Sequence, residues 1–492
     1  MKRILRQIPV LLCLLTCGLF AFIVLQQITG QQTLAFAYQN RSLLSNAVLI
    51  VPVLGLTALL LWLRTRESKP AADSLWALRI GFVIVLGAQF LVARCCWAHL
   101  GWDPAMMHRT AEELARGEMI SRPDYYVLCP NNAPLAVLQA VPLWAAVKLG
   151  IGVPYVVLHY IDAVLLNLSA YFCVRCVQLL TESRTARWFA IVVSIGWIAM
   201  SPYIVYPYTD VYSILFPVLA LYVYLKWTEK PVWQWFVISL LCFAGAAIKP
   251  TVLIMLIALL LMKLFTFRPV PWKRFAALAV AIVIGAVPGK VFQDKSTEFL
   301  AGSSKPEKQL SVTHYLMLGM NTATYGGHSP EDVAFTESFE TLSQRQSANI
   351  ARAWERVQER GVWGNVEFFA VKLYKSYADG SFASHGSFQE LELPKRSDGL
   401  SILLRSLYNK RGSLMPVCQT VAQGLWLGVL ALCAVAAFLQ RRNPSAALLC
   451  LTLLGLTAYL LLFEVWPRYL FLYAPFFVIL SSLAFDEPIC KK

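Results

Sequence analysis

The chain has 492 residues, of which 58% are hydrophobic and only 14% are charged. Soluble globular proteins are about 45–50% apolar and about 25% charged, so this composition excludes a soluble enzyme, a disordered chain and a single-span receptor. At about 20 residues per membrane span, it could supply ten to twelve helices. The formal charge of +15 forms no basic tract. It therefore indicates basic residues at the cytoplasmic ends of membrane helices rather than a nucleic-acid partner.

Apolar runs with the length of membrane spans recur along the whole chain. Twelve of them lie near 9–29, 43–63, 78–98, 153–180, 187–204, 211–226, 231–248, 250–266, 273–291, 420–440, 445–464 and 467–486. The segment Ala133 to Leu149 is apolar but barely long enough to span, so we interpret it as an interfacial helix. The sequence predicts an all-α polytopic membrane protein with about 12 transmembrane helices.

Lys and Arg residues give this protein an orientation. They follow every even-numbered run: Arg64, Arg66 and Lys69 after the second, Arg184 and Arg187 after the fourth, Lys226 and Lys230 after the sixth, Arg268, Lys273 and Arg274 after the eighth, Arg441 and Arg442 after the tenth, and Lys491 and Lys492 after the twelfth. The positive-inside rule then predicts a multi-pass protein of the cell membrane with both termini in the cytoplasm. Two long connections, 99–152 and 292–419, face outward. The second contains amphipathic stretches such as Ser347 to Arg360 and predicts a mainly helical extracytoplasmic subdomain.

The runs and loops divide the chain into four parts. Residues 1–77 hold two N-terminal spans, 78–291 a core of spans with the first outer loop, 292–419 the extracytoplasmic subdomain, and 420–492 three C-terminal spans.

An aspartate stands at the start of the first outer loop, in Trp102-Asp103-Pro104. Because proline favours the first helical position, Asp103 is predicted to be the N-cap of a helix from Pro104 to Gly117. A carboxylate held at the mouth of the membrane could also act as a general base or a metal ligand. The local spacing does not decide between these roles. No metal-ligand cluster is apparent, and a divalent metal ion stays open as a cofactor.

Three more charged residues belong to the same predicted face. Asp210 precedes the sixth run, Lys249 lies between the seventh and eighth, and Arg468 opens the twelfth. Each has a plainer role, in capping or in reaching the interface. Together, two acids and two cations suit a site for an anionic lipid headgroup, because cations bind phosphate while a carboxylate accepts a proton.

The order of these residues resembles the C-type (GT-C) glycosyltransferase superfamily, in particular the branch of protein O-mannosyltransferases and the lipid A aminoarabinose transferase. The Tyr-x-x-x-Pro-Asn-Asn pattern is most similar to multispan relatives in Gram-positive bacteria. The resemblance covers roughly 78–290 and 445–486. It rests on Trp102-Asp103-Pro104, Arg116-Gly117-Glu118, Tyr126, Pro130-Asn131-Asn132, Tyr208-Thr209-Asp210, Lys249-Pro250 and Arg468-Tyr469.

The resemblance implies an enzyme that moves a sugar from a polyprenyl-phosphate donor to a glycan, lipid or protein acceptor outside the membrane. It implies that Asp103 is the catalytic base, that Asp210 assists it, and that Lys249 and Arg468 bind the donor phosphate. Tyr126, Asn131 and Asn132 are then further candidates for substrate binding. Two extra N-terminal spans precede the core. Asp103 is followed by proline instead of the acidic neighbour of many mannosyltransferases, which weakens a prediction of metal dependence or mannose specificity.

A transporter or flippase of lipid-linked saccharides is the alternative. It is supported by His159-Tyr-Ile-Asp162 inside the fourth run, since ionisable residues at membrane depth are functional candidates. Asp162 could equally line a substrate cavity of a transferase. A noncatalytic assembly factor is a third reading with the same fold.

Overall fold

The computed structural model describes residues 7–29, 46–65, 75–152, 154–265, 271–302 and 306–487. Within these ranges, ten helices are long and apolar enough to cross a membrane, so the predicted all-α polytopic class is confirmed. The predicted spans 43–63 and 250–266 contain shorter apolar helices, Val48–Leu60 and Pro250–Phe265. Part of the orientation argument lies outside the described residues, namely Arg66, Lys69, Arg268, Lys491 and Lys492.

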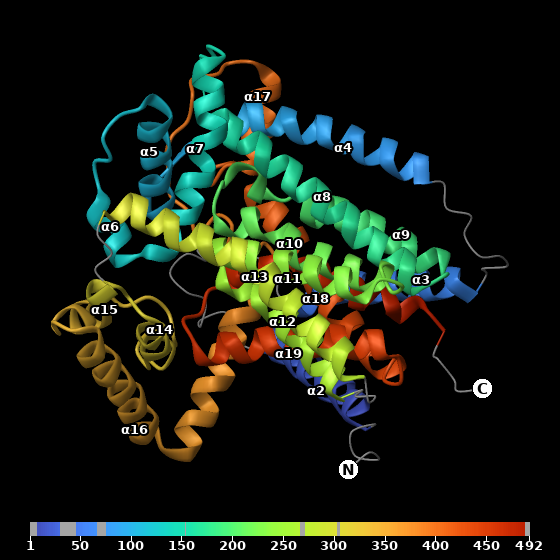
Figure 1. Ribbon diagram of the computed structural model, residues 1–492. Coiled ribbons are helices and arrows are strands. Elements are labelled where there is room, and N and C mark those ends of the chain that lie inside the picture. The colour runs from blue at the N-terminus through green and yellow to red at the C-terminus, as the bar shows by residue number, and fades with distance from the viewer. Residues whose placement is uncertain are drawn as a thin grey trace.

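The long helices pack into one bundle (Figure 1). Its members are α2 (Ile8–Thr29), α3 (Asn46–Thr65), α4 (Leu75–Cys96), α8 (Val156–Leu180), α9 (Arg184–Val193) continued by the π-helix η3 (Ser194–Ala199) and the 3-10 turn η4 (Pro202–Val205), α10 (Thr209–Lys226), α11 (Pro231–Ile248), η5 (Pro250–Val252) with α12 (Leu253–Phe265), α13 (Trp272–Ala301), α18 (Met415–Leu439), α19 (Pro444–Leu462), and η7 (Pro467–Tyr473) with α20 (Ala474–Ser482) and η8 (Leu483–Phe485). The last span is the most buried of the ten candidates, with 89% of its apolar window inside the protein.

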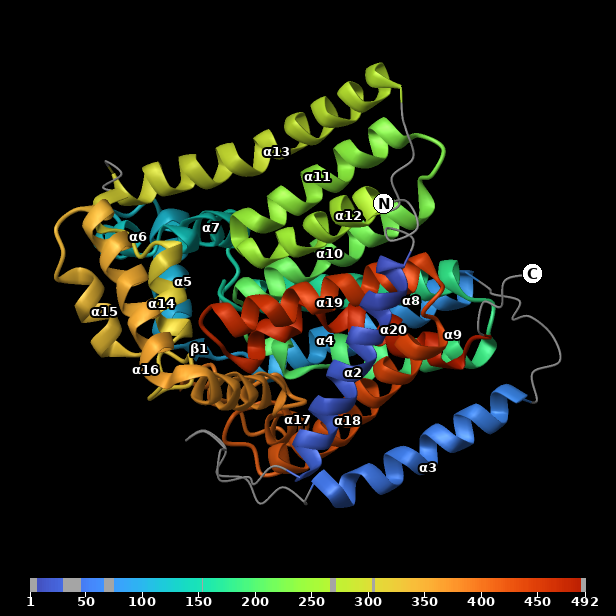
Figure 2. The same cartoon turned by 90° about the horizontal axis from the view of Figure 1, so that it is seen from below.

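Shorter helices gather at one end of this bundle, which we call the capped end (Figures 1 and 2). From the first connection come β1 (His99–Leu100), α5 (Trp102–Arg116), α6 (Pro123–Leu128), η2 (Pro130–Asn132) and α7 (Ala133–Lys148). From the second come η6 (Pro306–Lys308), α14 (Val312–Gly319), α15 (Pro330–Glu337), α16 (Leu342–Tyr377), β2 (Glu390–Glu392) and α17 (Gly399–Tyr408). The helix α7 corresponds to the predicted interfacial helix.

Helices α11 and α13 lie side by side, and small residues let them approach closely (Figure 2). A Cβ on Gly285 would be 2.6 Å from the carbonyl oxygen of Phe236, and one on Gly289 would be 2.4 Å from that of Phe243. This Gly-x-x-x-Gly spacing is typical of close helix contacts in membranes. It aligns α13, which runs ten residues beyond the predicted boundary at 291 and ends over the first connection, where Thr297 donates to the carbonyl of Pro130.

The second connection is helical, as predicted, and is fastened to the bundle by a buried lysine. The predicted helix Ser347 to Arg360 is part of α16, which bends at Gly361. Beyond the bend, the ammonium group of Lys372 donates to three carbonyls, those of Gly319 at 2.6 Å, Leu461 at 2.9 Å and Phe463 at 2.7 Å. The lysine therefore joins α16 to the ends of α14 and α19, and this holds α14 above the membrane helices.

Candidate functional site at the capped end

Asp103 lies in the first turn of α5, but it does not cap the helix. The N-cap is Gly101, and no side chain caps there, so the predicted capping role of Asp103 is wrong. The carboxylate is exposed and accepts two hydrogen bonds, from the Tyr125 hydroxyl at 2.9 Å and from the Tyr208 hydroxyl at 3.4 Å. Asp103 therefore faces a tyrosine-lined site instead of the helix N-terminus.

The backbone before Asp103 is held by a distant segment. Strand β1 pairs antiparallel with β2, and the amide of Gly101 donates to the carbonyl of Gln389 at 2.7 Å. A Cβ on Gly101 would come within 2.4 Å of Oε1 of Gln389, so a larger residue here would make that side chain move. The next residue, Trp102, has a φ of 57°, which costs a non-glycine residue about 1–3 kcal/mol. The strand pairing and this strained turn set the direction in which the side chain of Asp103 points.

The Pro-Asn-Asn motif orients one of the two tyrosines on Asp103. Asn131 donates to the side-chain oxygen of Asn132 at 3.1 Å, and Asn132 donates to the Tyr125 hydroxyl at 2.5 Å. Because its oxygen already accepts from Asn132, the hydroxyl group directs its own hydrogen at Asp103. The predicted candidate Tyr126 is fully buried beside α5 and does not face the carboxylate. Of the adjacent tyrosines, Tyr125 is the one at the site.

Arg468 lies on the other side of Tyr208. Its guanidinium carbon is 5.1 Å from the Tyr208 ring centre, 5.3 Å from that of Tyr469 and 5.9 Å from that of Phe388. Its Nε has no hydrogen-bond partner, and it forms no ion pair with any carboxylate in the part of the chain that the structure describes. Aromatic faces attract the cation without neutralising it. Arg468 thus keeps a positive charge beside the tyrosine that contacts Asp103.

Asp210 and Lys249 form a buried ion pair with each other. Asp210 is fully buried in the first turn of α10, and Lys249 is only 8% exposed at the end of α11. The Tyr469 ring, which also contacts Arg468, lies 4.7 Å from the Lys249 ammonium nitrogen. The structure therefore brings four predicted residues into one connected cluster, although Lys249 has its charge already balanced by Asp210.

Two residues at this site were not among the sequence candidates. Glu464 accepts a hydrogen bond from the Tyr469 hydroxyl at 3.0 Å. Tyr315, on α14 of the second connection, is close enough to Glu464 and Asp103 for both carboxylates to raise the pKa of its phenol, after the larger effect of burial. Glu464 stands four residues before Arg468, so its place in the sequence gave a signal. The sequence put Tyr315 in an outward-facing connection but did not indicate that it reaches Asp103.

The tyrosines at the site are hydrogen-bond donors at neutral pH. Burial, and then the negative charge of Asp103, raise the pKa of Tyr125 and of Tyr208 well above the usual range. A neutral phenol can donate to a carboxylate, whereas a phenolate would repel it. Both tyrosines therefore donate to the carboxylate of Asp103 and fix its position.

His108 anchors α5 from behind. The carbonyl of Pro207 can only accept, so Nε2 of His108 donates to it at 2.8 Å, and Nδ1 accepts from the Tyr155 hydroxyl at 2.6 Å. The ring is neutral in this arrangement. Burial lowers the pKa of His108 to about 4 from 6.5.

We expect acid to destabilise this anchor. Between pH 6.5 and about 4 the unfolded chain binds a proton at His108 that the folded chain does not, so stability falls as the pH falls. The full loss is about 3 kcal/mol for this shift. Thermal unfolding in detergent from pH 7 to 4 measures it, and His108→Gln, whose amide can still donate to Pro207, should flatten the slope. An equal slope in both proteins would contradict the expectation.

Asp162 lies away from this cluster. It is fully buried in α8, and neither carboxylate oxygen has a hydrogen-bond partner. It forms no hydrogen bond or ion pair with Asp103, Lys249 or Arg468, all of which are described. Its predicted role in substrate binding stays a prediction.

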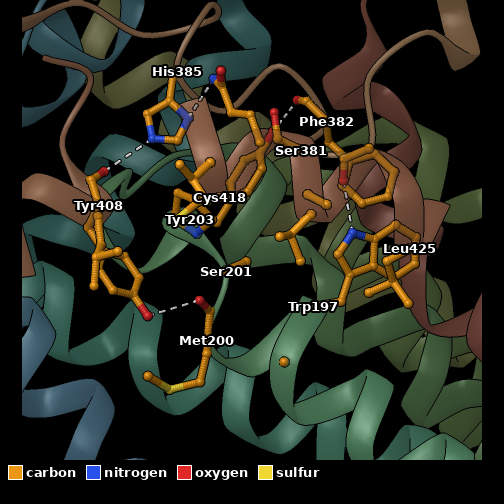
Figure 3. A pocket seen from close by; sticks show the side chains of 18 of the residues that line it. Trp197, Met200, Ser201, Tyr203, Ser381, Phe382, His385, Tyr408, Cys418 and Leu425 are labelled. Atoms are coloured by element: carbon orange, nitrogen blue, oxygen red, sulfur yellow. Dashed lines mark hydrogen bonds between the residues drawn. The ribbon is translucent and has the colours of Figure 1, made fainter. Parts of the chain in front are cut away.

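A cavity of about 320 Å³ is lined in part by Tyr203 and Phe471 (Figure 3). It is lined by the π-helix η3, by the segment after α16 and by the first turns of α18, among them Trp197, Phe382 and Leu425. Val417 and Val421 line it and are also exposed on α18, so the cavity reaches the surface of a candidate span.

The polar side chains of this cavity are engaged within the protein (Figure 3). Trp197 donates to the carbonyl of Gly380, Tyr408 to that of Met200, and His385 contacts that of Tyr408. Because their hydrogen-bonding capacity is already used, the cavity suits a hydrocarbon chain better than a sugar.

Residues 2–489 match the model of one protein family, described as conserved hypothetical integral membrane protein. The chain belongs to this family. It is an integral membrane protein, in agreement with its ten candidate spans. No curated protein and no solved structure shows significant similarity to the chain. Among the described residues of this family member, no three His, Cys, Asp or Glu side chains are grouped so as to hold a metal ion.

Proposed function

We propose that this protein is a glycosyltransferase of the GT-C type that uses a polyprenyl-phosphate sugar. The observation that carries the proposal is the placement of Asp103 and Arg468 on either side of Tyr208. A proton acceptor and an unpaired cation then stand together at one end of a membrane bundle. A donor of this class brings an anionic phosphate and a sugar to the membrane surface, and both charged groups have a use there.

The proposed reaction needs only these two groups and the substrates. Asp103 takes the proton of an acceptor hydroxyl or amine while that atom bonds to the anomeric carbon. The bond from the anomeric carbon to the phosphate oxygen breaks, and the electron pair leaves with the polyprenyl phosphate. Arg468 stabilises the negative charge that develops on this phosphate. The acceptor is a glycan, a lipid or a protein.

The ion pair has a different role in this proposal from the one that the family resemblance implies. Asp210 already neutralises Lys249, so the pair does not bind the phosphate. It instead holds the Tyr469 ring, which in turn contacts Arg468. The apolar cavity beside Tyr203 could accept part of the hydrocarbon of a lipid substrate, because it reaches the surface of α18.

The proposal includes an orientation, with the capped end outside the cell membrane and both termini in the cytoplasm. Cysteines introduced at Met119 and Leu149, which are highly exposed at the capped end, should react with a membrane-impermeant thiol reagent in intact cells. A cysteine at Trp227, where α10 ends at the opposite side of the bundle, should react only after permeabilisation. If the cysteine at Trp227 reacted in intact cells and the other two did not, Asp103 would lie on the cytoplasmic side, and this orientation would be wrong.

Arg468→Ala is the direct test of phosphate binding. We expect donor affinity to fall roughly 10- to 100-fold, since a hydrogen bond to a charged group contributes about 1.5–3 kcal/mol. Arg468→Lys should recover part of the loss. Arg352→Ala is the control, because Arg352 is an exposed arginine of α16 that pairs with Glu355. Binding of a radiolabelled polyprenyl-phosphate sugar to the purified protein is the measurement, and unchanged affinity in Arg468→Ala would contradict the assignment.

A transporter or flippase is the second candidate, because an unpaired carboxyl group, that of Asp162, lies inside a candidate span. The purified protein in vesicles separates the two functions. A transferase removes label from the lipid when an acceptor is present, whereas a flippase moves intact labelled lipid between leaflets.

A further inference from the structure

A group of polar side chains lies buried among α7, α8 and α10, apart from the Asp103 site. Its members are Gln139 on α7, His159 and Asp162 on α8, and Tyr212 on α10. Each of the four is at most 4% exposed. Five of their polar atoms have no hydrogen-bond partner in the described chain, namely Oε1 of Gln139, Nε2 of His159, both carboxylate oxygens of Asp162 and the hydroxyl of Tyr212. So many unsatisfied atoms in one place call for an explanation.

The hydrogen bonds that the group does make show which of its donors and acceptors are left over. Gln139 uses its amide nitrogen on the carbonyl of Pro207 at 3.2 Å, so its unsatisfied atom is an acceptor. Nδ1 of His159 faces the carbonyl of Tyr155 at 3.4 Å and is therefore the protonated nitrogen. The ring also lies close to the backbone carbonyl of Val205. The Tyr212 hydroxyl lies beside the side chains of Gln139 and Asp162. Asp162 is the member of the group whose polar atoms have neither a hydrogen-bond donor nor a counter-ion among the described residues.

An ionised Asp162 would have nothing to balance it. No Lys, Arg or His in the described chain forms an ion pair with it, and its helix places it about 9 Å beyond the start of α8, at 1.5 Å per residue. An uncompensated charge at such a position costs several kcal/mol. A single proton on the carboxyl group removes the charge and adds the missing donor.

We propose that Asp162 is a proton-binding site inside the membrane bundle, held neutral among Gln139, His159 and Tyr212. The titratable groups near it are Tyr155 at the N-cap of α8, Tyr212 on α10, and His159 three residues earlier on α8. His99, His108 and Glu112 surround Tyr155 and His159 from β1 and α5. The ligand is a proton, and the proposal is independent of glycosyl transfer.

The proton site is connected to the Asp103 site through one carbonyl. Pro207 accepts from both Gln139 and His108, and the next residue, Tyr208, donates to Asp103. Loss of the proton would leave a charge beside Tyr212 on α10, the helix that begins directly after Tyr208.

Infrared spectroscopy tests the proposal directly. The purified protein at neutral pH should show the carbonyl stretch of a protonated carboxylic acid, shifted in heavy water, and Asp162→Asn should lose this band. Asp103→Asn, which changes an exposed carboxylate, should keep it. Tyr212→Phe, a milder change, should shift the band without removing it, and it serves if Asp162→Asn does not fold. A band that is absent from the wild type, or retained in Asp162→Asn, would overturn the proposal.

Stability provides a second readout. A carboxyl group that keeps its proton more tightly when folded loses stability as the pH rises, because the unfolded chain releases the proton first. Between neutral and alkaline pH, the free energy of unfolding in detergent should therefore fall more for the wild type than for Asp162→Asn. If sodium or potassium instead raised the unfolding temperature of the wild type and not of Asp162→Asn, the site would bind a metal cation and the proton assignment would be wrong.

Discussion

Asp103→Asn should lower turnover roughly 10²- to 10⁴-fold, the usual contribution of a positioned general base. Asparagine has nearly the same size as aspartate, and both tyrosine hydroxyls can still form hydrogen bonds with it. The remaining carbonyl oxygen can accept from the hydroxyl of Tyr125, while the new amide can donate to that of Tyr208. Asp103 is exposed and does not cap α5, so the free energy of unfolding should change little. Transfer of label from a polyprenyl-phosphate sugar, per folded molecule, is the measurement.

Two further variants distinguish loss of the base from general damage to α5. Asp124→Asn changes another exposed aspartate of the same connection, one that pairs with Arg122, and should leave turnover unchanged. Tyr208→Phe keeps the ring beside Arg468 and removes one donor to Asp103, so it should lower turnover less than Asp103→Asn does. Normal turnover in Asp103→Asn would withdraw the assignment of the base.

The apolar runs predicted the membrane helices because a span must satisfy its backbone internally and cover it with apolar side chains. Because the spans must be apolar, Asp103, Asp210, Lys249 and Arg468 were expected at the ends of spans, and the count of spans put all four at the same end of the bundle. Their clustering follows from that shared end. The sequence could not show that Asp210 and Lys249 neutralise each other, since this depends on how α10 and α11 pack.

Local pattern was a poor guide to the orientation of side chains at the site. The Asp-Pro pair predicted a capped helix, but the pairing of β1 with β2 forces Trp102 into a positive φ and moves the cap to Gly101. Of two adjacent tyrosines, the rotation of α6 decides which one meets Asp103. Tyr315 arrives from a separate connection that Lys372 holds in place. All three features depend on contacts between segments far apart in the chain.

Removing one partner of the Asp210–Lys249 pair should strongly destabilise the protein. Either Asp210→Asn or Lys249→Met leaves an unbalanced charge in a buried position, which typically costs about 3–5 kcal/mol. The double variant removes both charges, so it should recover much of the loss. Thermal unfolding of the three variants in detergent measures this coupling.

The same variants decide between the two roles of Asp210. If Asp210 assists catalysis, as the family resemblance implies, Asp210→Asn should lose turnover per folded molecule beyond what its loss of stability explains. If the pair supports Tyr469 and Arg468, stability and donor affinity should fall together in each single variant and recover together in the double variant. A double variant that is stable but still inactive would assign a chemical role to Asp210, because the support would then be restored without the reaction.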